Sequence, residues 1–132
     1  MRLFRRGTRS RFPADMAAWL ETVGRNRLDQ TTSRVGGAGL WDRLGPLYQD
    51  ARADRDGFLA DLAALVAGDR RGFMTLGAAG VVWEIFGEEA LHIPAALSLV
   101  DAGIAMKTAR GLSDTAFTGY EMRRVRTLRG QG

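Results

Sequence analysis

The first pattern that could do chemistry is Glu89-Ala-Leu-His92, a Glu-x-x-His spacing. Residues three apart share a helix face, and carboxylate-bridged di-iron bundles use two such pairs with two further glutamates. Glu84 and Glu88 lie nearby, but His92 is the single histidine of the chain. Pro94 also indicates that His92 lies at a helix boundary. We therefore predict a solvated acidic cluster with no metal site and no cofactor; Glu88, Glu89 and His92 are only weak candidates for metal ligands.

Conventional catalytic sets are missing from the sequence. The chain has no cysteine, which excludes a thiolate zinc site, a cysteine nucleophile and a disulfide framework. None of its serines stands in a Gly-x-Ser-x-Gly motif, and Gly36-Gly-Ala-Gly39 lacks the following Lys-Ser/Thr of a phosphate loop. Asp61, Glu84 and Asp101 lie in otherwise apolar segments and could serve as acid and base, but we expect them to face solvent. These absences favour a chain that is not an enzyme; a small-molecule or metal-binding helical bundle enzyme stays open as an alternative.

Arginines at both ends are the strongest signal outside the expected core. Residues 1–11 carry a charge of +5, residues 12–109 carry −4 and residues 110–132 carry +3. Guanidinium groups pair bidentately with carboxylates and phosphates, so such ends suit an acidic protein surface, a nucleic acid or an anionic membrane. The predicted partner-binding residues are Arg123, Arg124, Arg126 and Arg129 near the C-terminus, and Arg2, Arg5 and Arg6 near the N-terminus.

Three kinds of partner are compatible with these arginines. We expect a partner protein with an acidic surface, or a second copy of the chain. Nucleic acid is the alternative, since several arginines along one helix could neutralise phosphates, although no helix-turn-helix or RNA-binding signature is present. Binding to a membrane surface would be weak, because only Met122, Val125 and Leu128 form the apolar side of the last helix.

Helical spacing of apolar residues dominates the rest of the chain and predicts an all-α fold of five or six helices. Pro13 and Pro94 suit first helical turns, Asp54 or Asp56 could cap a separate helix, and Pro46 should kink or restart a helix. Thr118-Gly-Tyr-Glu121 matches a capping box. The predicted helices span about 13–28, 40–51, 54–66, 72–86, 94–110 and 119–129, with a polar loop at 29–38.

The least polar segment, residues 72–86, is predicted to be the central buried helix. It is apolar around most of its circumference, and Gly77 and Gly80 would let a neighbouring helix approach closely. Residues 81–86 could instead form a buried strand, because Val, Trp, Ile and Phe favour sheets. We prefer the helix, since no second strand-like run exists to pair with it.

The domain organisation follows from these patterns. Residues 1–11 form a basic N-terminal arm, residues 12–129 a single helical domain, and residues 130–132 a tail. The arm lacks the continuous apolar core of a secretory signal, and no apolar stretch reaches the length of about 20 residues that spans a bilayer. We therefore expect a cytoplasmic protein without a transmembrane segment.

Overall fold

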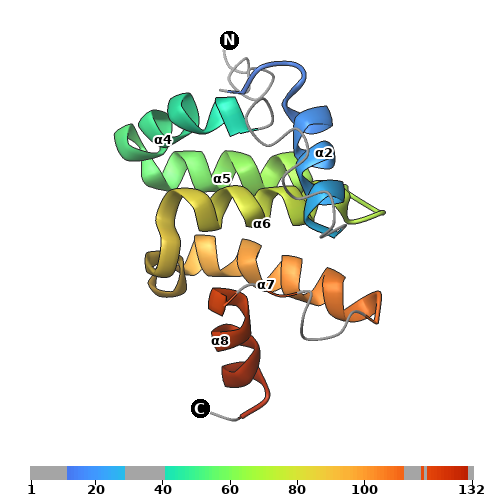
Figure 1. Ribbon diagram of the computed structural model, residues 1–132. Coiled ribbons are helices and arrows are strands. Elements are labelled where there is room, and N and C mark those ends of the chain that lie inside the picture. Colours follow the sequence, from blue (N-terminus) through green and yellow to red (C-terminus); the bar gives the residue numbers. More distant parts are fainter. Residues whose placement is uncertain (1–11, 29–40, 112–116, 118, 131–132) are drawn as a thin grey trace.

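A computed structural model describes residues 12–28, 41–111, 117 and 119–130. The predicted arm with Arg2, Arg5 and Arg6, the loop at 29–38 and the end of the tail lie outside the described residues. All regular structure in the described part is helical, so the prediction of an all-α fold is confirmed (Figure 1). The elements are α2 (Met16–Leu28), η2 (Trp41–Arg43), α4 (Leu44–Ala53), α5 (Arg55–Val66), α6 (Phe73–Phe86), η3 (Gly87–His92), α7 (Pro94–Ala109) and α8 (Gly119–Leu128), where η denotes a 3-10 helix.

Helix α6 contains the apolar segment predicted from the sequence. Its residues from Leu76 to Trp83 are all buried, and it contacts α2, α4, α5, α7 and η3. A helix needs no partner strand to satisfy its backbone groups, so residues 81–86 are helical although their side chains favour sheets. The helix begins after Gly72, whose φ of 87° is in the left-handed region that favours glycine.

Helices α2 and α6 cross at unusually close range because each contributes a glycine. A Cβ atom added to Gly24 would lie 1.8 Å from the backbone oxygen of Phe73, and one added to Gly77 would lie 2.0 Å from that of Leu20. The sequence predicted that Gly77 lets a neighbouring helix approach closely, and α2 does so. Gly24 lies inside α2, and its missing side chain admits the backbone of α6.

Helix ends follow local chemistry. Asp54 caps α5 by accepting a hydrogen bond from the backbone N–H of Gly57 at 3.1 Å, and Pro94 is the first residue of α7. Beyond the end of α7, Gly111 has a φ of 73° and donates its N–H to Thr108. Pro46 lies in the first turn of α4, where its missing N–H costs nothing, so the helix restarts before Pro46 rather than kinking at it.

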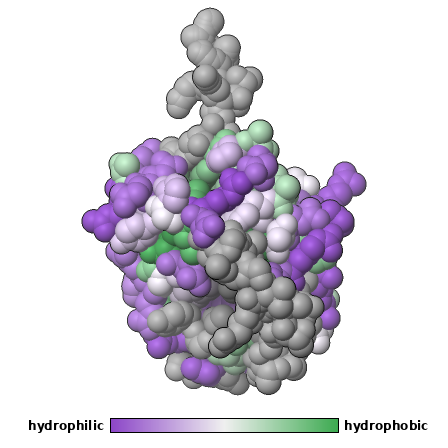
Figure 2. All heavy atoms as spheres, turned by 45° about the horizontal axis from the view of Figure 1, so that its top comes forward, coloured by the Kyte–Doolittle hydropathy of each residue, from purple (hydrophilic) through white to green (hydrophobic). Residues whose placement is uncertain are grey.

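One core joins the helices. It contains residues from α2, α4, α5, α6, η3, α7 and α8, and the rings of Phe12 and Phe58 meet edge to face within it at 5.7 Å. Figure 1 shows α8 at the edge of this body, reaching away from α7 toward the C-terminus. The face carrying α4 and the start of α2 is largely hydrophilic where it is coloured, with a small hydrophobic area between polar residues (Figure 2).

Across the described ranges, no single helix is long and apolar enough to cross a membrane. One pair of consecutive segments among the described residues is long and apolar enough when taken together. The pair is Phe73–His92 and Pro94–Ala109, and the chain bends by 115° between them.

Candidate interaction surfaces

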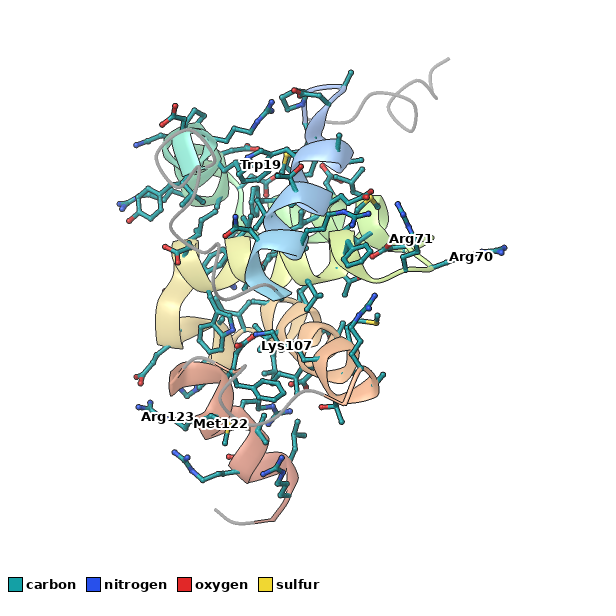
Figure 3. The ribbon with its side chains drawn as sticks, turned by 45° about the vertical axis from the view of Figure 1, so that its right-hand side comes forward. Trp19, Arg70, Arg71, Lys107, Met122 and Arg123 are labelled. Atoms are coloured by element: carbon teal, nitrogen blue, oxygen red, sulfur yellow. The ribbon has the colours of Figure 1, made fainter. Side chains whose placement is uncertain are left out.

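A buried ion pair links α8 to α7. The Nζ atom of Lys107 donates to Oε1 of Glu121 at 2.9 Å, and the two side chains are only 2% and 1% exposed. The ammonium group also lies 5.2 Å from the ring centre of Phe117. Figure 3 shows Lys107 where α7 and α8 meet. Glu121 was predicted to close a capping box with Thr118, which lies outside the described residues; its carboxylate holds Lys107, the only lysine of the chain.

Two of the predicted partner-binding arginines are engaged within the molecule. Arg124 makes a bidentate pair with Asp101 of α7, with both N–O distances at 2.8 Å. The hydrogen bonds that Arg124 donates to Asp101 raise the pKa of Arg124 above its ordinary value. Arg123 pairs with Glu88 of η3. Arg123 and Arg124 therefore orient α8 on the body of the protein.

The last turn of α8 is exposed, and we call Arg126, Leu128 and Arg129 the α8 tip. Leu128 lies seven residues after Glu121 and three after Val125, so it shares the helix face that packs on the body. Val125 is 5% exposed, whereas Leu128 is 54% exposed. The apolar face of α8 thus continues beyond the surface that covers it, and the arginines on either side of Leu128 in the sequence are exposed as well.

A second group of arginines was not predicted from the sequence. The guanidinium carbons of Arg25, Arg71 and Arg110 lie 4.1, 5.6 and 4.8 Å from the ring centre of Phe73. These arginines come from α2, the turn between α5 and α6, and the end of α7, and we call them the Phe73 arginine cluster. Because they are 39 or more residues apart, no local spacing pattern could reveal them. Figure 3 shows Arg71 at this turn, with Arg70 extending away from the body.

Glu21 ties two members of this cluster together. Its Oε2 atom accepts hydrogen bonds from Arg25 at 2.8 Å and from Arg71 at 3.0 Å. The hydrogen bond from Arg25, helped by the positive charge of Arg71, holds the pKa of Glu21 below its ordinary value despite partial desolvation. The third member, Arg110, donates to the backbone carbonyl of Arg71 at 2.8 Å, which is a neutral acceptor.

The titration of Glu21 provides a direct check on this arrangement. We expect its side-chain carboxyl to titrate, by NMR, below the ordinary pKa of a glutamate, because the ionised form is the one that Arg25 stabilises. The variant Arg25→Gln removes the main cause, so the pKa of Glu21 should rise toward its ordinary value. A Glu21 carboxyl that titrates normally in the unmodified protein would contradict the arrangement.

The weak metal candidates do not converge. Glu88, Glu89 and His92 all lie on η3; Glu88 is paired with Arg123, and Glu89 and His92 are exposed. No group of three His, Asp or Glu side chains in the described part of the chain is arranged to hold a metal ion. Of the carboxylates considered for acid–base chemistry, Asp101 is paired with Arg124 and Glu84 is exposed.

Among the cavities formed by the described residues, two open on the surface without bringing together a catalytic set. One, of about 280 Å³, lies between α4, α5 and the end of α6, and its polar lining comes from Tyr48, Arg52, Arg55 and Glu89. The other, of about 410 Å³, lies between the start of α2 and α4. Its lining residues are Phe12, Pro13, Met16, Arg43, Pro46, Leu47 and Asp50.

No protein-family model matches this chain, and no curated protein or solved structure matches it significantly. Its function must therefore be inferred from its own geometry and chemistry.

Proposed function

We propose that this chain is an accessory protein that binds the acidic surface of a partner protein through the α8 tip. The exposure of Leu128, at 54%, on the helix face that contains the buried residues Glu121 and Val125 is the observation that carries the proposal. Protein interfaces combine an apolar centre with a polar rim and are enriched in arginine, and Leu128 with Arg126 and Arg129 offers this combination. Two exposed guanidinium groups favour carboxylates on the partner.

The ion pairs of α8 support this assignment of roles. Arg124 and Glu121 hold the helix against α7, so that the tip is presented on a fixed element rather than on a loose segment. A surface that is positioned before binding loses less conformational entropy when the partner arrives. Arg123 and Arg124, which the sequence grouped with the tip, act in this proposal as anchors.

The charge-reversal variant Arg126→Glu/Arg129→Glu tests the proposal. We expect it to abolish the capture of specific proteins from a lysate of the source cells, because the two new carboxylates repel an acidic surface. Thermal stability should change by no more than a few degrees, since both side chains are exposed. The measurements are affinity capture with protein identification and a thermal melt.

The matched control reverses two exposed arginines elsewhere. Arg52→Glu/Arg55→Glu changes the net charge equally but leaves the α8 tip intact, so it should retain the captured proteins. Leu128→Ser should lose them without any change in charge. If both charge-reversal variants capture the same proteins, or lose the same ones, the α8 tip is not the binding surface.

A second copy of the chain could also supply the acidic surface, because residues 12–109 carry a net charge of −4. Sedimentation velocity distinguishes this case from a different partner: the unmodified protein would self-associate and Arg126→Glu/Arg129→Glu would not.

Nucleic acid is the less favoured partner for α8. Phosphate binding needs several arginines free to face one backbone, and Arg123 and Arg124 already contact carboxylates. Binding to a nucleic-acid backbone would also not explain why the apolar side chain of Leu128 is exposed. Capture of nucleic acid in place of protein, lost in Arg126→Glu/Arg129→Glu, would overturn the proposed function.

A further inference from the structure

We propose that the Phe73 arginine cluster is an anion-binding site for a phosphate monoester. The site is distinct from the α8 tip, and the proposal does not depend on the proposed function. It starts from the convergence of three guanidinium groups, from three separate elements, within 5.6 Å of one ring centre.

The charge balance of the cluster is positive. Three arginines face one carboxylate, that of Glu21, which leaves a surplus of two positive charges. On the same turn, the charge of Asp69 is matched by that of Arg70, and the Asp69 carboxylate accepts hydrogen bonds from the backbone N–H and the hydroxyl of Thr75, at 2.8 and 2.9 Å. A phosphate monoester carries a charge of about −1.5 to −2 at neutral pH, which matches this surplus.

The side chains are held in place without a ligand. Each guanidinium group rests against the ring of Phe73, and each also has a hydrogen bond, to Glu21 or to the carbonyl of Arg71. Cation–π contacts leave the edge of a guanidinium group, with its N–H donors, available to an anion. Little rotamer freedom would therefore be lost on binding.

The shape of the cluster distinguishes a monoester from other anions. Its three positive charges all lie within 5.6 Å of the ring centre of Phe73, and this local density of charge suits a single group with several oxygens and more than one charge. A nucleic-acid backbone carries single charges spread along the strand. An acidic protein surface would need an apolar centre, and Phe73 lies half-buried beneath the guanidinium groups.

The cluster is also open to solvent. The side chains of Arg25 and Arg71 are 52% and 64% exposed, so the phosphate need not belong to an enclosed small molecule. It can be carried by a soluble compound or by a lipid headgroup such as that of phosphatidic acid. Both sources present the same dianionic group, and the experiment below separates them.

Binding of phenyl phosphate, measured by calorimetry and by NMR shifts of arginine Nε–Hε groups, tests the site. We expect Arg110→Gln and Arg25→Gln each to weaken binding at least about tenfold, because each removes a charge-assisted hydrogen-bond donor. Arg25→Lys should also weaken it, since an ammonium group keeps the charge but loses the planar fork. Thermal melts show whether each variant is folded.

Two controls make the result specific. Arg55→Gln removes an arginine of similar exposure, 51%, from a different surface and should bind phenyl phosphate as the unmodified protein does. Dimethyl phosphate, a diester with a single charge, should bind at least about tenfold more weakly. Equal binding of the two phosphates, or equal binding by all variants, would overturn the proposal.

Vesicles decide the source of the phosphate. Cosedimentation with phosphatidylcholine vesicles containing phosphatidic acid, but not with phosphatidylcholine alone, and its loss in Arg110→Gln, would assign the site to a lipid headgroup. Binding of phenyl phosphate without vesicle binding would assign it to a soluble monoester. If neither phenyl phosphate nor phosphatidic acid binds, the proposal fails.

Discussion

Replacing Lys107 with methionine is expected to be among the most destabilising single changes in this protein. The substitution conserves much of the side-chain volume but leaves the carboxylate of Glu121, only 1% exposed, without its ammonium partner. Breaking a buried ion pair from one side costs about 3–5 kcal/mol, a large part of the 5–15 kcal/mol that stabilises a typical domain. We expect a fall of roughly 10–20 °C in the melting temperature, measured by calorimetry.

The double variant Lys107→Met/Glu121→Leu separates the loss of the pair from the loss of packing. Two apolar side chains of similar size remove both buried charges, so most of the stability should return. Hydrogen exchange adds a local readout, because in Lys107→Met the amides of α8 should exchange before those of α6. If Lys107→Met costs less than about 1 kcal/mol, the pair is not buried in solution as it is in the structure.

These expectations connect stability to the proposed function. The α8 tip is presented only while α8 is docked, and Glu121 and Arg124 are the polar residues that dock it on α7. A loss of partner binding in Lys107→Met would therefore come with a loss of α8 protection, whereas Arg126→Glu/Arg129→Glu should lose binding alone. The two variants distinguish a fold effect from a surface effect.

Local patterns predicted the elements well because helix formation depends on neighbours in the sequence. The cap at Asp54, one of the two aspartates considered for it, and the start at Pro94 involve groups no more than about four residues apart. The length and apolar character of residues 72–86 likewise predicted α6 as a helix.

Contacts between distant residues explain what the sequence did not predict. Arg124 and Asp101 are 23 residues apart, and Arg110 and Arg71 are 39 apart, so their pairing depends on how the helices pack. The sequence placed the arginines of the last helix in one partner-binding group, yet Arg124 is bound to a neighbouring helix while Arg126 is exposed. The spacing of residues shows which face of a helix is polar, but it does not show how far along the helix the rest of the protein covers it.

The crossing of α2 and α6 gives the second large expected effect. In Gly77→Ala the new methyl group would lie 2.0 Å from the backbone oxygen of Leu20, far inside the 3.0 Å limit that real Cβ atoms respect. A side chain could rotate away, but backbone cannot, so α2 must shift and lose contact with α6. We expect a loss of about 3 kcal/mol, although alanine favours helices over glycine by about 0.5–1 kcal/mol. Chemical denaturation measures this change.

Two further glycines calibrate this result. Gly68→Ala places a methyl group with no atom within 4 Å, so its stability should change by no more than about 0.5 kcal/mol. In Gly103→Ala the methyl group would lie 2.6 Å from the Cβ atom of Ala79, which is a side-chain atom and can be removed. Adding Ala79→Gly should therefore rescue Gly103→Ala in part, because the methyl group moves from α6 to α7. Gly77→Ala has no such rescue, since the atom that it would meet belongs to the main chain of α2. If Gly77→Ala lowers the stability no more than Gly68→Ala does, α2 and α6 do not cross this closely.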